Sequence, residues 1–205
     1  MIEILILAII CYLLGSIPFA YLIPKLFGFG DIRKIGSGNT GTTNVLRTGN
    51  KLLAIFVLVF DTLKGFIPLF YFQNYYSFEN IILLQIQPEI IIYLICSFAI
   101  IGHIFPVWLK FKGGKGVATF IGYLFGANYF LALLFIFSWL TVAIISRYSS
   151  LSSIISLIII PFISFYFFNI ITINALIFII SFFIILKHYS NILRLLNKTE
   201  NKIRF

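Results

Sequence analysis

Charged residues are scarce in this chain, and acidic residues are scarcer than basic ones. Only 10% of its 205 residues are charged and 61% are hydrophobic, whereas about a quarter of the residues of a soluble domain are charged. Such a chain could not cover itself with polar surface in water, which excludes an ordinary soluble globular protein. Together with a mean hydropathy of +1.09, this indicates that lipid is its solvent.

Cysteine, histidine and acidic residues are too few for several kinds of site. Cys11 and Cys96 lie in apolar runs, which indicates packing residues and excludes a disulfide framework or a CxxC motif. The two histidines and six acidic residues do not cluster, so neither a zinc site nor a metal-dependent lipid phosphotransferase site is expected. A GxSxG nucleophile elbow is also missing. We therefore expect an activity that needs neither metal nor cofactor.

Six apolar runs account for the membrane crossings. Most are close to the ~20 residues that a helix needs to span a bilayer, and open strands could not satisfy their backbone groups in lipid. The first run has no basic region before it and no clear cleavage site after it, so we expect a retained helix and not a signal peptide. The runs comprise residues 2–23, 52–72, 90–108, 117–145, 151–169 and 171–186.

The uneven distribution of basic residues predicts how the chain crosses the membrane. The net charge of +9 is explained by basic loops that are held on the cytoplasmic side of the membrane. It is explained equally well by the binding of an anionic substrate or an anionic lipid. Residues 25–51 and 110–115 carry several Lys and Arg, whereas residues 73–89 carry none. The positive-inside rule therefore places the first two segments in the cytoplasm and the N-terminus outside.

The apolar run at residues 117–145 decides the number of crossings. A single crossing would leave Arg147 and the basic tail outside, whereas a turn at residues 126–128 would place both inside. The run has 29 residues, fewer than the roughly 40 that two full crossings need, and two short or partly re-entrant helices would resolve this. We predict an all-α, polytopic integral membrane bundle of about seven transmembrane helices, with the N-terminus outside, the C-terminus cytoplasmic, and residues 1–205 forming a single membrane-embedded domain.

A glycine-rich stretch at residues 36–44 is the first polar motif. Gly36, Gly38 and Gly41 let the backbone turn so that successive N–H groups point at one anion, and Arg47 can bind phosphate bidentately. A mobile polar loop is the alternative, but so many polar residues in so apolar a chain favour an anion site. The GxGxxG spacing does not indicate a dinucleotide site, because its flanks are membrane helices. Hydrogen-bonding side chains in this stretch are Ser37, Asn39, Thr42, Thr43 and Asn44.

A second motif, at residues 102–116, ends in Gly113-Gly114-Lys115-Gly116. Such a sequence before a helix is expected to offer free N–H groups and a lysine at the helix N-terminus, which suits an anion. It is not a P-loop, because the first glycine and the Ser/Thr of that motif are missing. The alternative is a positive-inside loop anchored at the interface by Trp108.

Two further motifs lie toward the C-terminus. Arg147 and Ser149 follow an apolar run. Arg147 could serve equally well as a positive-inside signal or, with Ser149, as a contact to the ligand. Lys187, Asn191 and Arg194 are predicted to share one helical face, with His188 one residue off that face.

Three ionisable residues in apolar surroundings need separate explanations. Asp61 and Lys64 lie three residues apart inside the second apolar run, where burial is costly, and we predict a mutual structural ion pair. His103, like His188, falls in a segment rich in Gly, Lys or Arg, so structural and functional roles both stay open.

The segments at residues 36–44, 102–116 and 187–194 resemble the signature segments of the acyl-phosphate:glycerol-3-phosphate acyltransferase family, PlsY, in order and spacing. The resemblance implies a multi-pass enzyme of the bacterial inner membrane with its active site at the cytoplasmic face. It would transfer an acyl chain from acyl phosphate to the 1-hydroxyl of sn-glycerol 3-phosphate, giving lysophosphatidic acid and phosphate. The HxxxxD motif of other glycerolipid acyltransferases is missing, as the family pattern requires. The chain departs from that pattern before Glu200, where Asn197-Lys198-Thr199 stand and family members often have glycine.

The resemblance also suggests roles for individual residues. The first loop would bind the phosphate of acyl phosphate, and His188 and Asn191 would orient the attacking hydroxyl. The general base is either His188 or the substrate's own phosphate. Expected catalytic residues are Ser37, Lys115, His188 and Asn191. Expected substrate-binding residues are Gly36, Gly38, Asn39, Gly41, Thr43, Asn44, Arg47, His103, Gly113, Gly114, Arg147, Ser149 and Lys187. We expect the protein to be a monomer surrounded by membrane lipid, without a nucleic acid partner.

An organic-phosphate transporter is the competing interpretation, since it would share the polytopic fold and the basic, glycine-rich loops. Transporter sites usually lie near the bilayer midplane between repeats. Here the anion-binding groups fall at helix ends on one predicted face, and no inverted repeat is visible. A purely structural scaffold would give no reason for four polar motifs on one side.

Overall fold

The computed structural model describes residues 2–36, 38–76 and 87–203. Within these ranges the secondary structure is entirely helical, which confirms the predicted all-α class. The chain divides into two compact units, unit 1 (Met1–Ala127) and unit 2 (Asn128–Phe205), and each is described by itself.

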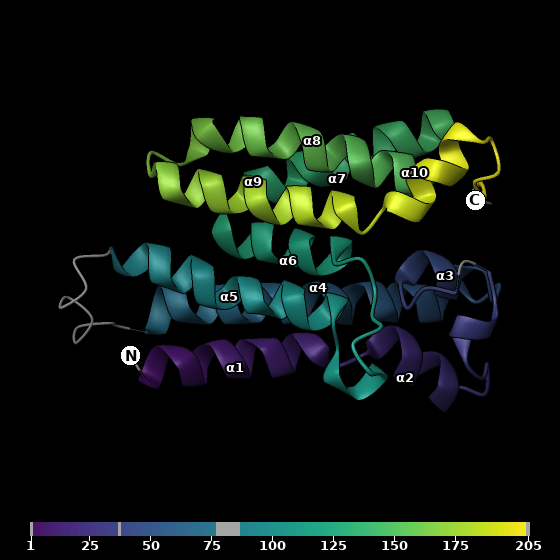
Figure 1. The fold of residues 1–205 in the computed structure, drawn as a ribbon, viewed down its shortest axis with the longest axis horizontal. Coiled ribbons are helices and arrows are strands. Elements are labelled where there is room, and N and C mark those ends of the chain that lie inside the picture. Colours follow the sequence, from purple (N-terminus) through teal and green to yellow (C-terminus); the bar gives the residue numbers. More distant parts are fainter. Residues whose placement is uncertain (1, 37, 77–86, 204–205) are drawn as a thin grey trace. The chain divides into compact units, whose positions relative to one another are not determined.

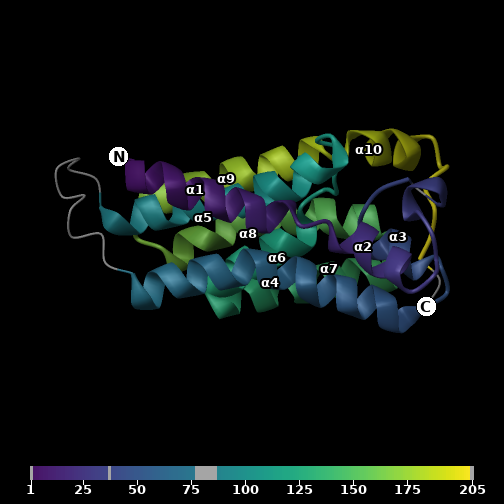
Figure 2. The same ribbon diagram turned by 90° about the horizontal axis from the view of Figure 1, so that it is seen from below.

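Unit 1 is a bundle of long helices with short elements at one end. α1, α4, α5 and α6 run alongside one another, and α2 and α3 lie toward the end away from the N-terminus (Figures 1 and 2). The elements of unit 1 are α1 (Ile2–Ser16), α2 (Phe19–Leu26), the 3₁₀ turn η1 (Ile32–Lys34), α3 (Thr42–Leu46), α4 (Lys51–Tyr75), α5 (Pro88–Ile104), the 3₁₀ turn η3 (Val107–Leu109) and α6 (Val117–Ala127).

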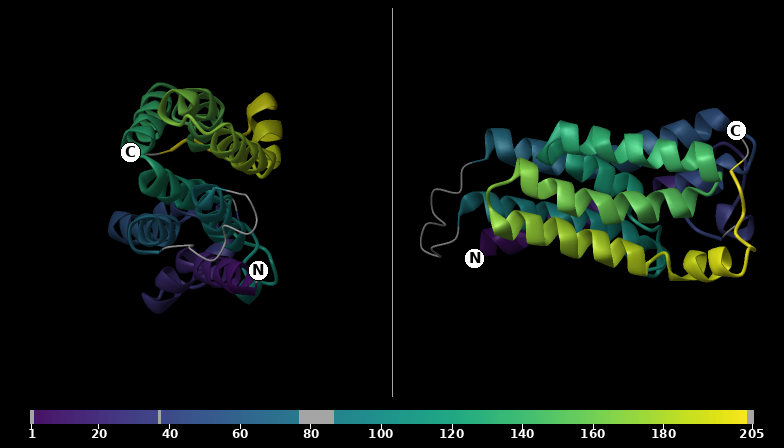
Figure 3. Two further views of the ribbon diagram at one scale, coloured as in Figure 1. Left: turned by 90° about the vertical axis from the view of Figure 1, so that its left-hand side faces the viewer. Right: turned by 90° about the horizontal axis from the view of Figure 1, so that it is seen from above.

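Unit 2 is built from three long helices and a short one. α7 packs on α8 and α8 on α9, and α10 follows α9 at a bend of 57° (Figure 3). The elements are α7 (Tyr129–Ser146), α8 (Ser149–Phe167), α9 (Ile171–Leu186) and α10 (Tyr189–Leu196).

The described helices account for most of the predicted membrane crossings. Five segments are long and apolar enough to span a bilayer, and the number rises to six if the bent pair α9–α10 is counted as one span. α6 is apolar but shorter. Large apolar side chains such as Leu5, Phe137 and Phe162 are exposed on these helices, as expected for a surface in lipid.

The predicted break at residues 126–128 is confirmed. α6 ends at Ala127, and α7 begins after Asn128, whose side chain caps it by accepting the Leu131 N–H at 3.2 Å. The first apolar run, predicted as one helix, is instead divided between α1 and α2. Pro18 stands at this division, where its missing N–H ends the helical hydrogen-bond ladder.

Glycine residues allow the helices of unit 1 to approach closely. A Cβ at Gly65 would collide with the carbonyl oxygen of Thr119, and one at Gly122 would collide with that of Thr62. α4 and α6 therefore touch through their backbones, as small residues permit in membrane helix pairs. This contact fixes α6, whose N-terminus follows Lys115.

Candidate active site

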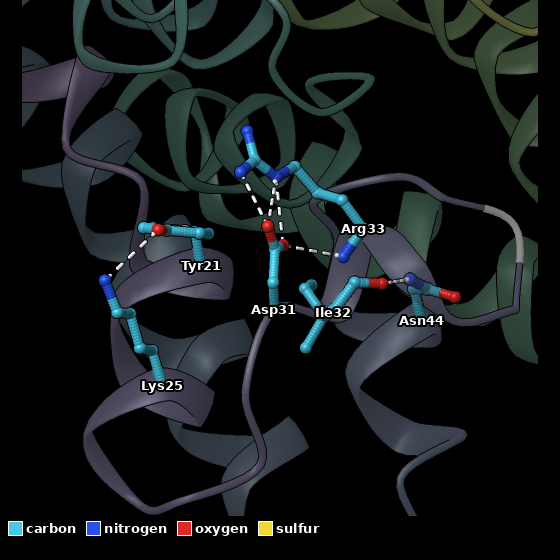
Figure 4. A network of polar contacts seen from close by, with 6 residues as sticks. All are labelled: Tyr21, Lys25, Asp31, Ile32, Arg33 and Asn44. Carbon is cyan, nitrogen blue, oxygen red and sulfur yellow. Dashed lines mark hydrogen bonds and ion pairs between the residues drawn. The ribbon is translucent and has the colours of Figure 1, made fainter.

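Asn44 shapes the glycine-rich loop of unit 1. Its buried side chain donates hydrogen bonds to the carbonyl oxygens of Ile32 at 2.8 Å and Ile35 at 3.2 Å, and Figure 4 shows the first of these. Gly41 caps α3 by accepting the Asn44 N–H at 2.9 Å. The amide of Gly38 also stays within the loop, since it donates to Ile35 at 3.0 Å. Asn44 thus holds the loop in place, and part of the loop's donor capacity is used internally.

Arg47 lies against the start of this loop. Gly36 has a φ of +55°, and a Cβ there would lie 2.8 Å from Arg47 Cδ and would also collide with Asn44. Glycine is therefore required both for the backbone conformation and for the space. Arg47 is exposed and forms no ion pair with any described residue, which suits it to an incoming anion. Ser37, predicted as catalytic, lies outside the described residues, and Asn39 and Thr43 are half-buried.

The other guanidinium near the loop, that of Arg33, is already paired. It donates to both carboxylate oxygens of Asp31, at 2.9 and 2.6 Å (Figure 4). These bonds lower the pKa of Asp31 to about 2, so the carboxylate is ionised at physiological pH. Arg33 also lies 4.8 Å above the ring of Tyr21, whose hydroxyl accepts from Lys25 at 3.4 Å. Arg47 is consequently the better candidate for substrate phosphate.

Two predicted donors of the second motif are occupied within the protein. Gly113 N–H donates to the Ile104 carbonyl at 3.1 Å, and Gly114 N–H donates to the His103 carbonyl at 3.2 Å. The expectation that these amides are free for an anion is therefore wrong, because the chain folds back on the end of α5 after residue 105. Lys115 is half-buried and precedes α6, whose first turn has N–H groups without intrahelical acceptors.

Gly114 brings the first two motifs together. A Cβ at this position would collide with His103 Nε2 and would lie 2.6 Å from the carbonyl oxygen of Thr40. Thr40 belongs to the glycine-rich loop and His103 to the end of α5, so Gly114 lies between them. The loop, Gly114 and Lys115 thus form one cluster within unit 1.

Asp61 and Lys64 form the predicted ion pair, with Lys64 Nζ 2.8 Å from Asp61 Oδ1. Lys64 Nζ also donates to the Ile17 carbonyl at 2.9 Å, at the division between α1 and α2. His103 Nδ1 lies 3.7 Å from the same Asp61 oxygen. His103 is only 7% exposed, which fits a supporting role better than direct contact with substrate.

In unit 2, Glu200 joins the third and fourth motifs. Its Oε1 accepts from Ser150 Oγ at 2.8 Å and from Asn191 Nδ2 at 2.6 Å, while its Oε2 accepts from Arg194 Nε at 2.6 Å. Asn191 and Arg194 therefore share a helical face, as predicted. Lys187 does not lie on this face. It is the residue that caps the end of α9, whereas α10, which carries Asn191 and Arg194, begins only at Tyr189.

The C-terminal segment also fixes the turn that carries Arg147 and Ser149. Ile203 N–H donates to the Arg147 carbonyl at 2.7 Å, and Figure 3 shows the segment returning from α10 to the α7–α8 turn. Arg147 ends α7 with a φ of +61° and its side chain is exposed. Ser149 is half-buried at the start of α8. Arg147, Ser149, Asn191 and Glu200 thus belong to one cluster within unit 2.

The histidine of this cluster has a defined tautomer. His188 is buried, and its Nδ1 lies 2.8 Å from the Ile184 carbonyl oxygen. Because a carbonyl oxygen can only accept, Nδ1 carries the proton, and in the neutral ring Nε2 is the acceptor nitrogen. An imidazole held this way can orient a hydroxyl group and take its proton.

From the sequence alone Glu200 was only a weak site candidate whose role stayed open, although a further signal was present. It is the only acidic residue after Glu89, in a segment rich in basic residues. Burial alone would raise its pKa, but the hydrogen bonds from Arg194, Asn191 and Ser150 outweigh burial and lower it. Glu200 is therefore a charged acceptor that organises the neighbouring polar groups. Among the described residues, no three acidic, His or Cys side chains gather in a way that could hold a metal ion.

Glu200→Gln is expected to destabilise the protein by about 1–3 kcal/mol at pH 7, because a neutral amide cannot accept all three hydrogen bonds. A lowered pKa gives stability that is present above the unfolded value of about 4.3 and is lost as the pH falls. The difference in melting temperature between wild type and variant should therefore narrow below about pH 4. Glu89→Gln, at an exposed position in α5, is the control and should change little. A difference that stays constant from pH 7 to pH 3 would contradict this explanation.

Comparisons with known proteins point to a single family. The family model of glycerol-3-phosphate acyltransferase matches residues 5–198. The glycerol-3-phosphate acyltransferase of Pelagibacter ubique (strain HTCC1062) is 46% identical over 203 residues, covering 98% of each chain. That of Ehrlichia ruminantium (strain Gardel) is 47% identical and covers 95% of this chain and 94% of its own. The crystal structure of PlsY (YgiH), an integral membrane glycerol 3-phosphate acyltransferase, in its glycerol 3-phosphate form, has a TM-score of 0.87 and 35% identity, and the match covers 98% of this chain and 96% of that one. The chain belongs to the glycerol-3-phosphate acyltransferase family.

Proposed function

We propose that this chain transfers an acyl chain from acyl phosphate to the 1-hydroxyl of sn-glycerol 3-phosphate, releasing lysophosphatidic acid and phosphate in the first acylation of phospholipid synthesis. The observation that carries the proposal is the packing of the glycine-rich loop against the Gly-Gly-Lys segment at Gly114. Two phosphorylated substrates require two neighbouring anion-binding segments. The family membership, and the similarity to an acyltransferase solved in glycerol 3-phosphate and lysophosphatidic acid forms, support the same activity.

This reaction requires positioning more than covalent catalysis. Acyl phosphate is a mixed anhydride with a good leaving group, so the enzyme needs no covalent intermediate. The hydroxyl oxygen attacks the carbonyl carbon, the bond from that carbon to the phosphate oxygen breaks, and phosphate leaves with the bonding electrons. The protein must hold two mutually repelling anions, orient the hydroxyl and stabilise charge on the carbonyl oxygen. The proposal assigns no metal or cofactor to these steps.

In unit 1, the proposal assigns one cluster of groups to the phosphates. The glycine-rich loop, with Ser37, Asn39 and Thr43, binds the phosphate of acyl phosphate, and Asn44 keeps that loop folded. Arg47 and Lys115 bind glycerol 3-phosphate, since both are cationic and flank the loop and Gly114 respectively. The remaining glycines, Gly36, Gly38, Gly41, Gly113 and Gly114, provide the backbone shape.

In unit 2, Arg147 and Ser149 are assigned to glycerol 3-phosphate, while His188 and Asn191 orient its hydroxyl. The proton of that hydroxyl passes either to His188 Nε2 or to the departing phosphate. His188→Asn separates the two routes, because asparagine can still donate to the Ile184 carbonyl but lacks Nε2. A fall in kcat of about 10²-fold or more would assign the proton to His188. A fall of only a few fold, with unchanged KM values, would assign it to the phosphate.

We also propose seven membrane crossings, with the N-terminus outside and the C-terminus cytoplasmic. The six spans that length and apolarity allow, together with the shorter α6, would make seven. The basic segments then face the cytoplasm of a bacterial cell, at the inner membrane, where the substrates of lipid synthesis arise. The two units would act as a single monomeric acyltransferase domain. Cysteine accessibility at residue 28 and residue 87, measured in intact cells, tests this orientation, since only residue 87 should react from outside.

The experiment that tests the activity uses the purified full chain in detergent or lipid mesophase. Acyl phosphate and glycerol 3-phosphate are added without metal, and phosphate release is followed. Release that needs both substrates, with lysophosphatidic acid formed and acyl-CoA inert, is the expected result. A folded sample that releases nothing, while liposomes that carry it take up glycerol 3-phosphate, would establish transport instead.

A further inference from the structure

The buried pair of Asp61 and Lys64 has no role in the reaction proposed above. Both side chains lie inside α4 and are 1% and 6% exposed, and charges in a membrane segment are costly. Stability alone explains such a pair poorly, because replacing a buried ion pair by apolar side chains is often neutral or stabilising. Their contacts beyond each other point to another purpose.

These contacts run from the α1–α2 division to the Gly-Gly-Lys segment. Lys64 Nζ binds the Ile17 carbonyl at 2.9 Å and Asp61 at 2.8 Å. Asp61 Oδ1 faces His103 Nδ1 at 3.7 Å. The opposite nitrogen of that ring, Nε2, lies against Gly114, so tightly that a Cβ at Gly114 would collide with it. The residue after Gly114 is Lys115.

A small cavity lies beside the same groups. Its volume is about 10 Å³, and Ser16, Thr40, Asp61, Lys64 and His103 are among its lining residues. This volume suits about one water molecule. Ser16 Oγ and His103 Nδ1 are buried and form no hydrogen bond to another group in the described part of the chain. A water molecule in such a site can link Asp61 Oδ1 to His103 Nδ1, which lie 3.7 Å apart.

We propose that Asp61, held by Lys64, acts through His103 to position the segment at residues 113–115 for the binding of glycerol 3-phosphate. The carboxylate fixes the orientation of the imidazole, and the ring edge confines Gly114 against the Thr40 carbonyl. Asp61 and His103 are thus positioning residues, which keep Lys115 in register with the glycine-rich loop. The inference rests on the proposed function, in which Lys115 binds the phosphate of glycerol 3-phosphate.

His103→Asn is the first test. Asparagine retains an amide nitrogen near the position of Nδ1, facing Asp61, but lacks the ring atoms that lie against Gly114. The KM for glycerol 3-phosphate should rise about tenfold, because a small displacement of a binding group is enough for this. The KM for acyl phosphate should stay within about twofold. His103→Gln, which can place an amide near the position of Nε2, should restore much of the affinity for glycerol 3-phosphate.

A second variant removes the charges themselves. Asp61→Asn combined with Lys64→Met avoids leaving one buried charge unpaired, and it should also raise the KM for glycerol 3-phosphate selectively. Asn174→Ala is the matched control for buried polar loss. Asn174 is 1% exposed, binds Ser164 and the Phe168 carbonyl at 2.9 Å each, and belongs to unit 2. This control should lower the melting temperature and leave both KM values unchanged.

The rise in melting temperature with added glycerol 3-phosphate provides a readout that does not depend on turnover. In His103→Asn the same rise should need about tenfold more glycerol 3-phosphate. Folded variants with wild-type affinity for both substrates would overturn the inference, and so would equal losses for both substrates. If His103→Asn does not fold, the double variant decides by the same criteria. Wild-type protein that binds glycerol 3-phosphate without turnover would refute the proposed reaction, while this titration would still test the positioning role.

Discussion

Lys115→Ala is expected to lower kcat/KM by about 10³-fold while the protein still folds and inserts into the membrane. Lys115 follows Gly114, the point where the glycine-rich loop and the end of α5 meet, and it precedes the N-terminus of α6. Two substrate phosphates that approach each other in a poorly solvated site repel strongly. A cation next to the point where the two segments meet offsets that repulsion in the ground state and the transition state.

The measurement is phosphate release from acyl phosphate in the presence of glycerol 3-phosphate, with the melting temperature as the check on folding. Lys112→Ala is the matched control, because Lys112 is an exposed lysine in the same loop and should retain near-normal activity. This comparison separates the effect of one positioned charge from the general effect of a basic loop. A well-folded Lys115→Ala enzyme with near-normal activity would show that the assignment is wrong.

The long elements of this fold follow from sequence pattern alone. The run at residues 171–186 coincides with α9, and the run at residues 52–72 lies within α4. Apolarity and length suffice for such helices, because lipid leaves the backbone no other way to satisfy its hydrogen bonds. The break before α7 was predicted from loop charge, and the Asn128 side chain caps the helix that begins there.

Short elements and individual hydrogen bonds could not be predicted in the same way. The amides of Gly113 and Gly114 were expected to face an anion, yet the chain reversal after α5 brings them to the carbonyls of Ile104 and His103. Whether an N–H group is free depends on where the chain turns, which glycine content does not specify. The interruption between α1 and α2 was also missed, although Pro18 marks it.

The relation between the motifs likewise needed the fold. Ser150 and Glu200 lie 50 residues apart in the chain and meet through a single hydrogen bond. Thr40 and Gly114 are farther apart and touch through backbone atoms. The sequence indicates which residue types could bind phosphate, but only tertiary packing shows that Asn44 and Glu200 hold other groups in place.

The close crossing of α4 and α6 leads to the largest expected effect on stability. A Cβ at Gly122 would lie 2.8 Å from the carbonyl carbon of Thr62 and 3.0 Å from Phe66 N, in addition to its collision with the Thr62 oxygen. These are backbone atoms, so no side-chain rotation can relieve the clash, and the two helices must separate. Gly122→Ala is therefore expected to destabilise the protein by about 3 kcal/mol, and the displacement of α6 should also lower kcat/KM, because its N-terminus follows Lys115.

Gly126→Ala is the control within the same helix pair. A Cβ at Gly126 would lie 2.9 Å from Leu69 Cβ and 3.1 Å from its Cγ, whereas one at Gly122 would lie far closer to the Thr62 oxygen. A much smaller displacement of the two helices therefore relieves the contact at Gly126. Its melting temperature and activity should stay closer to those of the wild type. Melting in detergent, followed by circular dichroism, and phosphate release measure the two effects. Equal losses in the two variants would mean that the backbone contact at Thr62 does not limit the approach of α4 and α6, and that α6 tolerates displacement without disturbing Lys115.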